Sequence, residues 1–107
     1  MPVRSVRRRY LWINLETTMN LDSKLLNEII DEKIHFLYGI KGAIEINYKL
    51  IDFIPENQNA IIRCNHNKLN EMRTTLAHIT KIKGENFRAS VKKVSGTIKT
   101  LRHKVKT

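Results

Sequence analysis

Four strand-like segments alternate with two long stretches of helical spacing in this chain, in an order that few folds can accommodate. The strand patterns cover residues 10–15, 48–54, 60–64 and 87–94. Apolar side chains recur at helical spacing from Leu25 to Leu37 and from Leu69 to Ile79. The order strand, helix, strand, strand, helix, strand closes most economically into a four-stranded antiparallel sheet with two helices on one face. The sequence therefore predicts an α+β fold of the ferredoxin-like sandwich type.

The first helix has a cap signal at its start and two glycines near its end. Asn20 or Asp22 can accept a hydrogen bond from a free backbone N–H at the start. Gly39 and Gly42 interrupt the helical pattern, so we expect the helix to end near Tyr38. A short turn or a second helical piece should follow.

Similar signals divide the second half of the chain. Pro55 and the polar residues 56–59 separate the second and third strands, which we therefore expect to form a hairpin. Asn65 or Asn67 should cap the second long helix. Gly84 marks a turn before the last strand.

The first strand predicts which face of the sheet the long helices cover. Leu11, Ile13 and Leu15 lie on one side of this strand, and Tyr10 and Trp12 lie on the other. If the aliphatic side faces the two long helices, the aromatic side cannot remain bare. A third helix after the last strand, a partner, or both should cover it. The apolar residues of that third helix are Ile98, Leu101 and Val105.

A chain of 107 residues is long enough for one domain with its own core. We expect a flexible basic arm over residues 1–8 and a single domain over residues 9–107. Cys64 is the only cysteine, which excludes an internal disulfide and favours a reducing compartment. No apolar run approaches the ~20 residues that cross a bilayer, and the start lacks the apolar stretch of a secretory signal. These observations predict a cytoplasmic protein, or a nuclear one if the source has a nucleus, with no membrane association.

Positive charge is concentrated at the two ends of the chain. Residues 1–9 carry four arginines and no acid, and residues 81–107 carry nine basic residues and one acid. Residues 10–80 carry seven basic and nine acidic residues, so the three segments contribute +4, −2 and +8 to the formal net charge of +10. Such a charge repels itself unless a polyanion screens it. We therefore expect the ends to contact a phosphate backbone, while the middle folds and contacts protein.

The segment from Ser95 to Lys99, Ser-Gly-Thr-Ile-Lys, is the sharpest candidate for a phosphate site. It follows a strand and opens a helix, whose first N–H groups are unpaired and carry a partial positive charge. Gly96 would let a phosphate come close, and Thr97 adds a hydroxyl. The alternative is a plain helix cap at Ser95 followed by a solvated basic helix. The neighbouring basic residues, which favour phosphate binding, are Lys92, Lys93, Arg102 and Lys104.

No set of residues predicts catalysis by this chain alone. The four histidines are far apart in sequence and lie near no second cysteine, so no metal site is expected. Cys64 lies at a strand end without a histidine arranged to activate it, which predicts a buried, inert thiol. Tyr10 and Trp12 could stack RNA bases, as in an RNA-recognition motif. The third strand lacks the aromatic residues of that motif, however, which favours a packing role.

Three segments together resemble the ribonuclease P protein component 2 family. They are the strand end and loop at 60–67, the helix at 69–79 and the helix start at 94–99. The most characteristic motifs of the family are Ile-Arg-Cys at 62–64 and Ser-Gly-Thr-Ile-Lys at 95–99. The resemblance extends more loosely to the first strand and the helix after it. Because an acidic C-terminal extension is lacking, the chain looks archaeal rather than animal.

The resemblance implies a role in the ribonucleoprotein that removes the 5′ leader from precursor tRNA. The family has a ferredoxin-like fold and binds ribonuclease P protein component 3, with which a heterotetramer is expected, beside other ribonuclease P proteins. The ribonuclease P RNA, with bound Mg²⁺, hydrolyses the phosphodiester. The protein would bind no cofactor and supply no catalytic residue; it would stabilise the RNA and raise its metal affinity. The residues predicted to bind RNA are Arg7, Arg8, Arg9, Arg63, Lys92, Lys93, Ser95, Gly96, Thr97, Lys99, Arg102 and Lys104.

The neutral middle of the chain is the predicted protein-contact region. Gly39, Ile40 and Gly42 lie in a turn beside the exposed side of the first helix, where acidic and apolar groups would not attract RNA. The alternative is an ordinary loop over the core. The alternative function is a stand-alone RNA-binding or chaperone module, which shares the charge pattern but not the protein partner.

Overall fold

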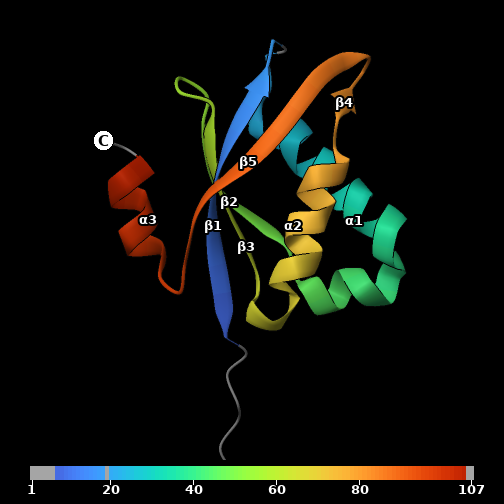
Figure 1. Cartoon of the computed structure of the whole chain (residues 1–107), viewed down its shortest axis with the longest axis vertical. Coiled ribbons are helices and arrows are strands. Elements are labelled where there is room, and N and C mark those ends of the chain that lie inside the picture. Colours follow the sequence, from blue (N-terminus) through green and yellow to red (C-terminus); the bar gives the residue numbers. More distant parts are fainter. Residues whose placement is uncertain (1–6, 19, 106–107) are drawn as a thin grey trace, which may run out of the picture.

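The protein is built around an antiparallel sheet with helices on both faces (Figure 1). The computed structural model describes residues 7–18 and 20–105. The strands are β1 (Arg8–Thr17), β2 (Lys49–Ile54), β3 (Asn59–Asn65), β4 (Lys81–Ile82) and β5 (Glu85–Ser95). The helices are α1 (Ser23–Ile46), α2 (Leu69–His78) and α3 (Ile98–Val105), and a 3-10 turn, η1 (His66–Lys68), precedes α2.

The strand order is β2-β3-β1-β5-β4, with β1 paired to β3 on one side and to β5 on the other. Helices α1 and α2 lie together on one face of the sheet, and α3 lies on the opposite side (Figure 1). The order of β2, β3, β1 and β5 is that of a ferredoxin-like sheet, and β2 and β3 form the expected hairpin. The predicted fold class is therefore confirmed.

Strand β4 is the element that the sequence pattern does not predict. It contains only Lys81 and Ile82, which pair with residues 85–86 of β5. Between them, Lys83 and Gly84 have φ angles of 50° and 83°. Two consecutive positive φ angles are those of a tight hairpin turn. A strand of two residues is too short to show alternation, so only Gly84 marked this turn.

The main core lies between the sheet and the two long helices. As predicted, Leu11, Ile13 and Leu15 of β1 are buried there. Their main buried partners on the helices and on β3 are Leu26, Ile30, Ile34, Ile62, Met72 and Leu76. A smaller second core lies on the opposite face, where Leu101 of α3 covers Ile61. Tyr10 and Trp12 pack against this second core, so the predicted division of the two faces is confirmed.

A bulge in β5 changes which of its side chains reach the main core. Val91 and Lys93 pair with consecutive residues of β1, which leaves Lys92 as an extra residue. The alternation that buries Phe87 therefore shifts by one position, and Val94 packs on the main core beyond the bulge. The sequence pattern predicts that side chains alternate regularly between the two faces of the sheet through Val94. The bulge shows that this prediction is wrong beyond Val91.

Helix α1 consists of two helical pieces joined at a glycine. Asp22 caps its start, as predicted, by accepting a hydrogen bond from the Leu25 N–H at 2.7 Å. Gly39 has φ 72° and ψ −173°, a conformation that is essentially restricted to glycine. The expected end near Tyr38 is therefore a kink, after which the helix continues to Ile46.

Two boundary predictions are corrected by the structure. Strand β1 begins at Arg8, inside the predicted arm, while residues 1–6 of that arm lie outside the described residues. Neither η1 nor α2 has a side-chain cap at its start, so the predicted asparagine caps are wrong. Asn65 instead donates its side-chain N–H to the Glu45 carbonyl at 2.8 Å. A contact with a distant helix thus replaces the local cap.

Cys64 is a free thiol in the main core, fully shielded from solvent. Burial, with a smaller contribution from the Glu71 carboxylate, raises its pKa from 9.0 to about 11. The thiol therefore stays protonated at neutral pH.

Replacement of Gly39 by alanine should destabilise the protein by roughly 1–3 kcal/mol, because the positive φ strains any residue with a Cβ. Nothing lies within 4 Å of the added Cβ, so crowding would not contribute. Urea denaturation measures this loss. The exposed neighbour Lys41 provides the control: Lys41→Ala should leave the unfolding free energy nearly unchanged. Equal stability of the two variants would contradict the assigned strain.

The raised pKa of Cys64 predicts a pH-dependent loss of stability in alkali. Between pH 9 and pH 11 the unfolded thiol loses its proton while the folded thiol keeps it, so the unfolding free energy falls as pH rises. Cys64→Val removes this titration. The natural chain should therefore lose stability relative to Cys64→Val between pH 8 and pH 10.5, as measured by urea denaturation. A constant difference would refute the shift.

Candidate nucleic-acid interface

Basic residues from both ends of the chain meet at one end of the sheet. Strand β1 enters the sheet between the final residues of β3 and β5, beside the connection to α3 (Figure 1). Tyr10 therefore pairs with Arg63 on one side and with Ser95 on the other. The charge that the sequence places at its two termini is thus gathered in one region by the pairing of β1.

The guanidinium group of Arg9 lies close to the backbone that leads into α3. A Cβ atom at Gly96 would come to 3.3 Å from Nη1 of Arg9. The same guanidinium nitrogen donates to the Arg8 carbonyl at 3.2 Å. A cation and the N-terminal end of a helix therefore lie together, and both attract anions. Sequence analysis selected Arg9 and Gly96 separately and did not predict their contact.

Ser95 and Thr97 shape the entry to α3. The backbone N–H of Thr97 donates to Oγ of Ser95 at 3.2 Å, and the hydroxyl oxygens of Thr97 and Thr100 lie 3.1 Å apart. Helix α3 begins only at Ile98, so Ser95 closes a turn before the helix and the predicted cap at Ser95 is wrong. Thr97 and Lys99 are exposed, so a ligand can reach the segment from solvent. Phosphate binding by this segment stays a prediction.

The bulge in β5 gives the two neighbouring lysines different surroundings. Lys92, the extra residue, is exposed. Lys93 is half-buried and lies opposite Trp12, on the face that α3 covers. Lys92 is therefore the more accessible of the two for a phosphate.

Arg102 of α3 forms an ion pair with Asp52 of β2. A bulge in β2 places Asp52 opposite Ile61, on the α3 face. Nε and Nη2 of Arg102 donate to the two Asp52 carboxylate oxygens at 2.6 and 3.4 Å. This hydrogen bonding and the Asp52 charge raise the pKa of Arg102. Arg102 therefore has a structural partner that its place in the basic run did not predict.

The other predicted RNA contacts occupy varied positions. Arg7 and Arg8 are exposed, and the Arg7 carbonyl accepts the N–H of His66 at 2.9 Å. Arg63 is half-buried, with its Nε shielded from solvent and without a hydrogen-bond partner among the described residues. Lys104 lies in α3, and its side chain is outside the described part of the chain. RNA contact by these residues stays a prediction.

An apolar patch on α1 marks the other predicted surface. The α1 patch consists of Phe36, Ile40 and Ile44, whose exposed fractions are 80%, 74% and 72%. These are the large apolar residues that stand out as exposed among the described residues. Of the three predicted protein contacts, only Ile40 belongs to the patch. Gly39 provides the kink, and Gly42 leaves room for Tyr38, whose Cβ would collide with a side chain there.

Sequence reasoning did not single out Phe36 and Ile44 as exposed apolar residues. Phe36 lies before the kink at Gly39, and Ile40 and Ile44 lie four residues apart on the helical piece after it. Of the two predicted continuations after Tyr38, a short turn or a second helical piece, the structure has the second: the chain kinks at Gly39 and helical backbone continues to Ile46.

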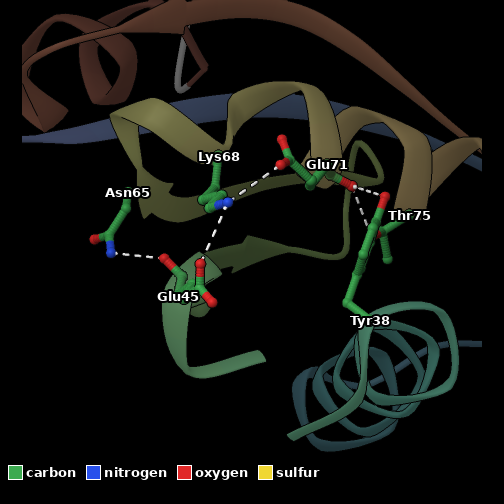
Figure 2. A network of polar contacts seen from close by, with 6 residues as sticks. All are labelled: Tyr38, Glu45, Asn65, Lys68, Glu71 and Thr75. Atoms are coloured by element: carbon green, nitrogen blue, oxygen red, sulfur yellow. Dashed lines mark hydrogen bonds and ion pairs between the residues drawn. The ribbon is translucent and has the colours of Figure 1, made fainter. Parts of the chain in front are cut away.

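A polar network holds the second piece of α1 in place (Figure 2). The Lys68 ammonium lies 3.4 Å from the Glu45 carboxylate and 3.5 Å from that of Glu71. Hydrogen bonding to Glu45 and the charges of both carboxylates raise the pKa of Lys68. Figure 2 also shows Tyr38 and Thr75 donating to the Glu71 carbonyl, at 3.3 and 2.8 Å. The segment that carries Ile40 and Ile44 is therefore in polar contact with η1 and α2.

The described residues contain no group of three or more His, Cys, Asp and Glu side chains placed to hold a metal ion. Within the same residues, no helix combines the length and apolar character needed to span a membrane.

Comparison with known proteins gives a consistent result. The model of the Rpp14/Pop5 family matches residues 9–106. Ribonuclease P protein component 2 of Methanosarcina barkeri is 31% identical over 100 residues, covering 92% of this chain and 72% of the relative. The protein of the same name from Methanosarcina mazei is 28% identical over 102 residues, covering 92% and 84%.

A solved structure shares the fold. A chain in the cryo-EM structure of yeast ribonuclease MRP superposes with a TM-score of 0.71, over 98% of this chain and 95% of that chain, at 12% identity. The family match spans β1 to α3, including the Arg9–Gly96 contact and the helix start that follows it. The chain therefore belongs to the Rpp14/Pop5 family.

Proposed function

We propose that this chain is a protein subunit of ribonuclease P that binds and stabilises the RNA that removes the 5′ leader from precursor tRNA. The observation that carries the proposal is the contact between Arg9 and the helix start at Gly96. It joins the two basic ends of the chain in one anion-attracting region. The names of the Methanosarcina relatives support the particular ribonucleoprotein.

Phosphate neutralisation is the physical basis of the proposed binding. Each phosphate contact by a lysine or arginine releases a condensed counterion, so the affinity falls with rising salt concentration. These contacts do not distinguish bases, and recognition of folded RNA depends largely on shape. Arg9 of β1 and Lys99 of α3 would provide cations at this end of the sheet.

In this proposal the hydrolysis and the Mg²⁺ that it needs belong to the RNA. Closely packed RNA helices repel each other through their phosphates, and protein cations reduce that repulsion. The chain would therefore lower the Mg²⁺ concentration at which the catalytic RNA folds and acts. It would hold no cofactor and supply no nucleophile. A cytoplasmic location stays a prediction.

The α1 patch is the proposed docking surface for ribonuclease P protein component 3. Exposed apolar side chains in a row are typical of protein-binding surfaces. The Lys68 network fixes the segment that carries Ile40 and Ile44, which reduces the entropy lost on binding. The patch favours a subunit of an assembly over a stand-alone RNA-binding module. A heterotetramer with component 3 is the assembly that we propose.

Replacement of Arg9 and Lys99 by glutamine should weaken binding of ribonuclease P RNA and flatten its salt dependence. Two lost phosphate contacts should reduce the slope of log affinity against log salt by roughly 1.4–1.8. Filter binding of the transcript across a range of salt concentrations measures this slope. The matched control is Lys24→Gln with Lys41→Gln, which removes the same charge from α1. Identical slopes for the two double variants would overturn the assigned surface.

Replacement of Ile40 and Ile44 by serine should abolish or greatly weaken the association with component 3. Both side chains are largely exposed, so folding stability should change little. Calorimetric titration with purified component 3 measures the association, and thermal denaturation checks the fold. Lys41→Ser on the same segment serves as the control and should bind normally. Full affinity of the Ile40/Ile44 variant would exclude the α1 patch as the docking surface.

A further inference from the structure

Two rows of side chains cross the sheet on the face that α3 covers. In each row an aromatic ring of the central strand β1 has a basic residue directly beside it: Tyr10 pairs with Arg63, and Trp12 pairs with Lys93. Lys49 extends the first row, since it pairs with Arg63 from β2. Aromatic rings flanked by cations are the elements with which proteins bind single-stranded nucleic acid. Both rings are only half-buried.

Two hydrogen-bond donors on this face are left without acceptors. The indole N–H of Trp12 and Nε of Arg63 are both shielded from solvent and have no hydrogen-bond partner among the described residues. Buried donors of this kind nearly always find an acceptor in a folded protein. The closed arrangement therefore leaves two donors on this face without acceptors among the described residues. Base carbonyls and phosphate oxygens of RNA would supply the missing acceptors.

Helix α3 is held only weakly on this face of the sheet. It has eight residues, too few to be stable as a helix away from the sheet. Leu101 is its one fully buried apolar side chain among the described residues, and Ile98 packs beside it. The Arg102–Asp52 pair is partly exposed to solvent, and such pairs contribute little. Figure 1 shows α3 standing apart from the other helices, joined to β5 by a short connection that contains Gly96.

We propose that the sheet face beneath α3 is a second RNA site, specific for unpaired nucleotides, which α3 vacates when the RNA binds. The bases stack on Tyr10 and Trp12, and Arg63 and Lys93 contact the backbone. Release of Arg102 from Asp52 accompanies the opening. This inference rests on the proposed role as an RNA subunit, and it adds a single-stranded site to the cationic region that binds folded RNA.

Trp12 is the only tryptophan of the chain and reports on this site directly. The full chain is titrated at low salt with a fluorescently labelled 12-nucleotide oligouridine, and anisotropy of the label measures binding independently of Trp12. Stacking should quench the Trp12 emission in parallel with the anisotropy change. Tyr10→Leu keeps an apolar side chain but removes the ring, and it should weaken binding by at least about five-fold.

Loosening α3 from the sheet should increase the affinity for the oligouridine. Asp52→Asn removes the charge that holds Arg102, so the open state should become more populated and the oligouridine affinity should rise about two- to five-fold. Glu56→Gln, in the exposed β2–β3 turn, changes the net charge equally and is the matched control. Glu56→Gln should raise the affinity by less than Asp52→Asn does. Its Trp12 quenching at saturation should equal that of the natural chain.

Two results would overturn the inference. One is an unchanged Trp12 emission while anisotropy shows saturated oligouridine, because the RNA would then lie elsewhere. The other is equal affinity of Asp52→Asn and Glu56→Gln, because the cover would then play no part. In either case, salt-dependent binding of ribonuclease P RNA to the same preparation would leave the proposed subunit function standing. Loss of the binding of ribonuclease P RNA as well would contradict both this inference and the proposed subunit function.

Discussion

The antiparallel pairing of β1 with both β3 and β5 is the constraint that organises this protein. Because β1 runs between these strands, its first residues lie beside the last residues of each. Two basic segments that are about ninety residues apart in sequence therefore meet at one end of the sheet. The Arg9 guanidinium lies close to Gly96, before the start of α3. The candidate interface is thus a consequence of sheet topology.

The same sheet separates the surface proposed to bind protein from the surface proposed to bind RNA. One face is closed by α1 and α2 over a large aliphatic core, and the outer side of α1 presents the α1 patch. The opposite face has a small core beneath α3, with aromatic rings and basic residues around it. The two proposed surfaces therefore lie apart, because α1 and α3 lie on opposite sides of the sheet (Figure 1).

Local patterns predicted much of this architecture, and long-range contacts account for what they missed. Alternation in β1 and helical spacing in α1 and α2 fixed the order and facing of the elements. The strand β4 and the bulge at Lys92 were missed because each involves only one or two residues. Asn65 was misread as a cap because its acceptor, the Glu45 carbonyl, lies twenty residues earlier. The residue types of the candidate site were predictable, whereas the Arg9–Gly96 contact and the Arg102–Asp52 pair require the folded sheet.

The central claim is that the chain supplies cations to a catalytic RNA and no chemistry of its own. The most direct measurement is the rate of 5′-leader removal from precursor tRNA by ribonuclease P RNA at limiting Mg²⁺, with and without this chain and component 3. The account predicts that the proteins shift the Mg²⁺ requirement to lower concentration and that they cleave nothing when the RNA is omitted. An unchanged Mg²⁺ requirement, or cleavage by the proteins alone, would contradict it.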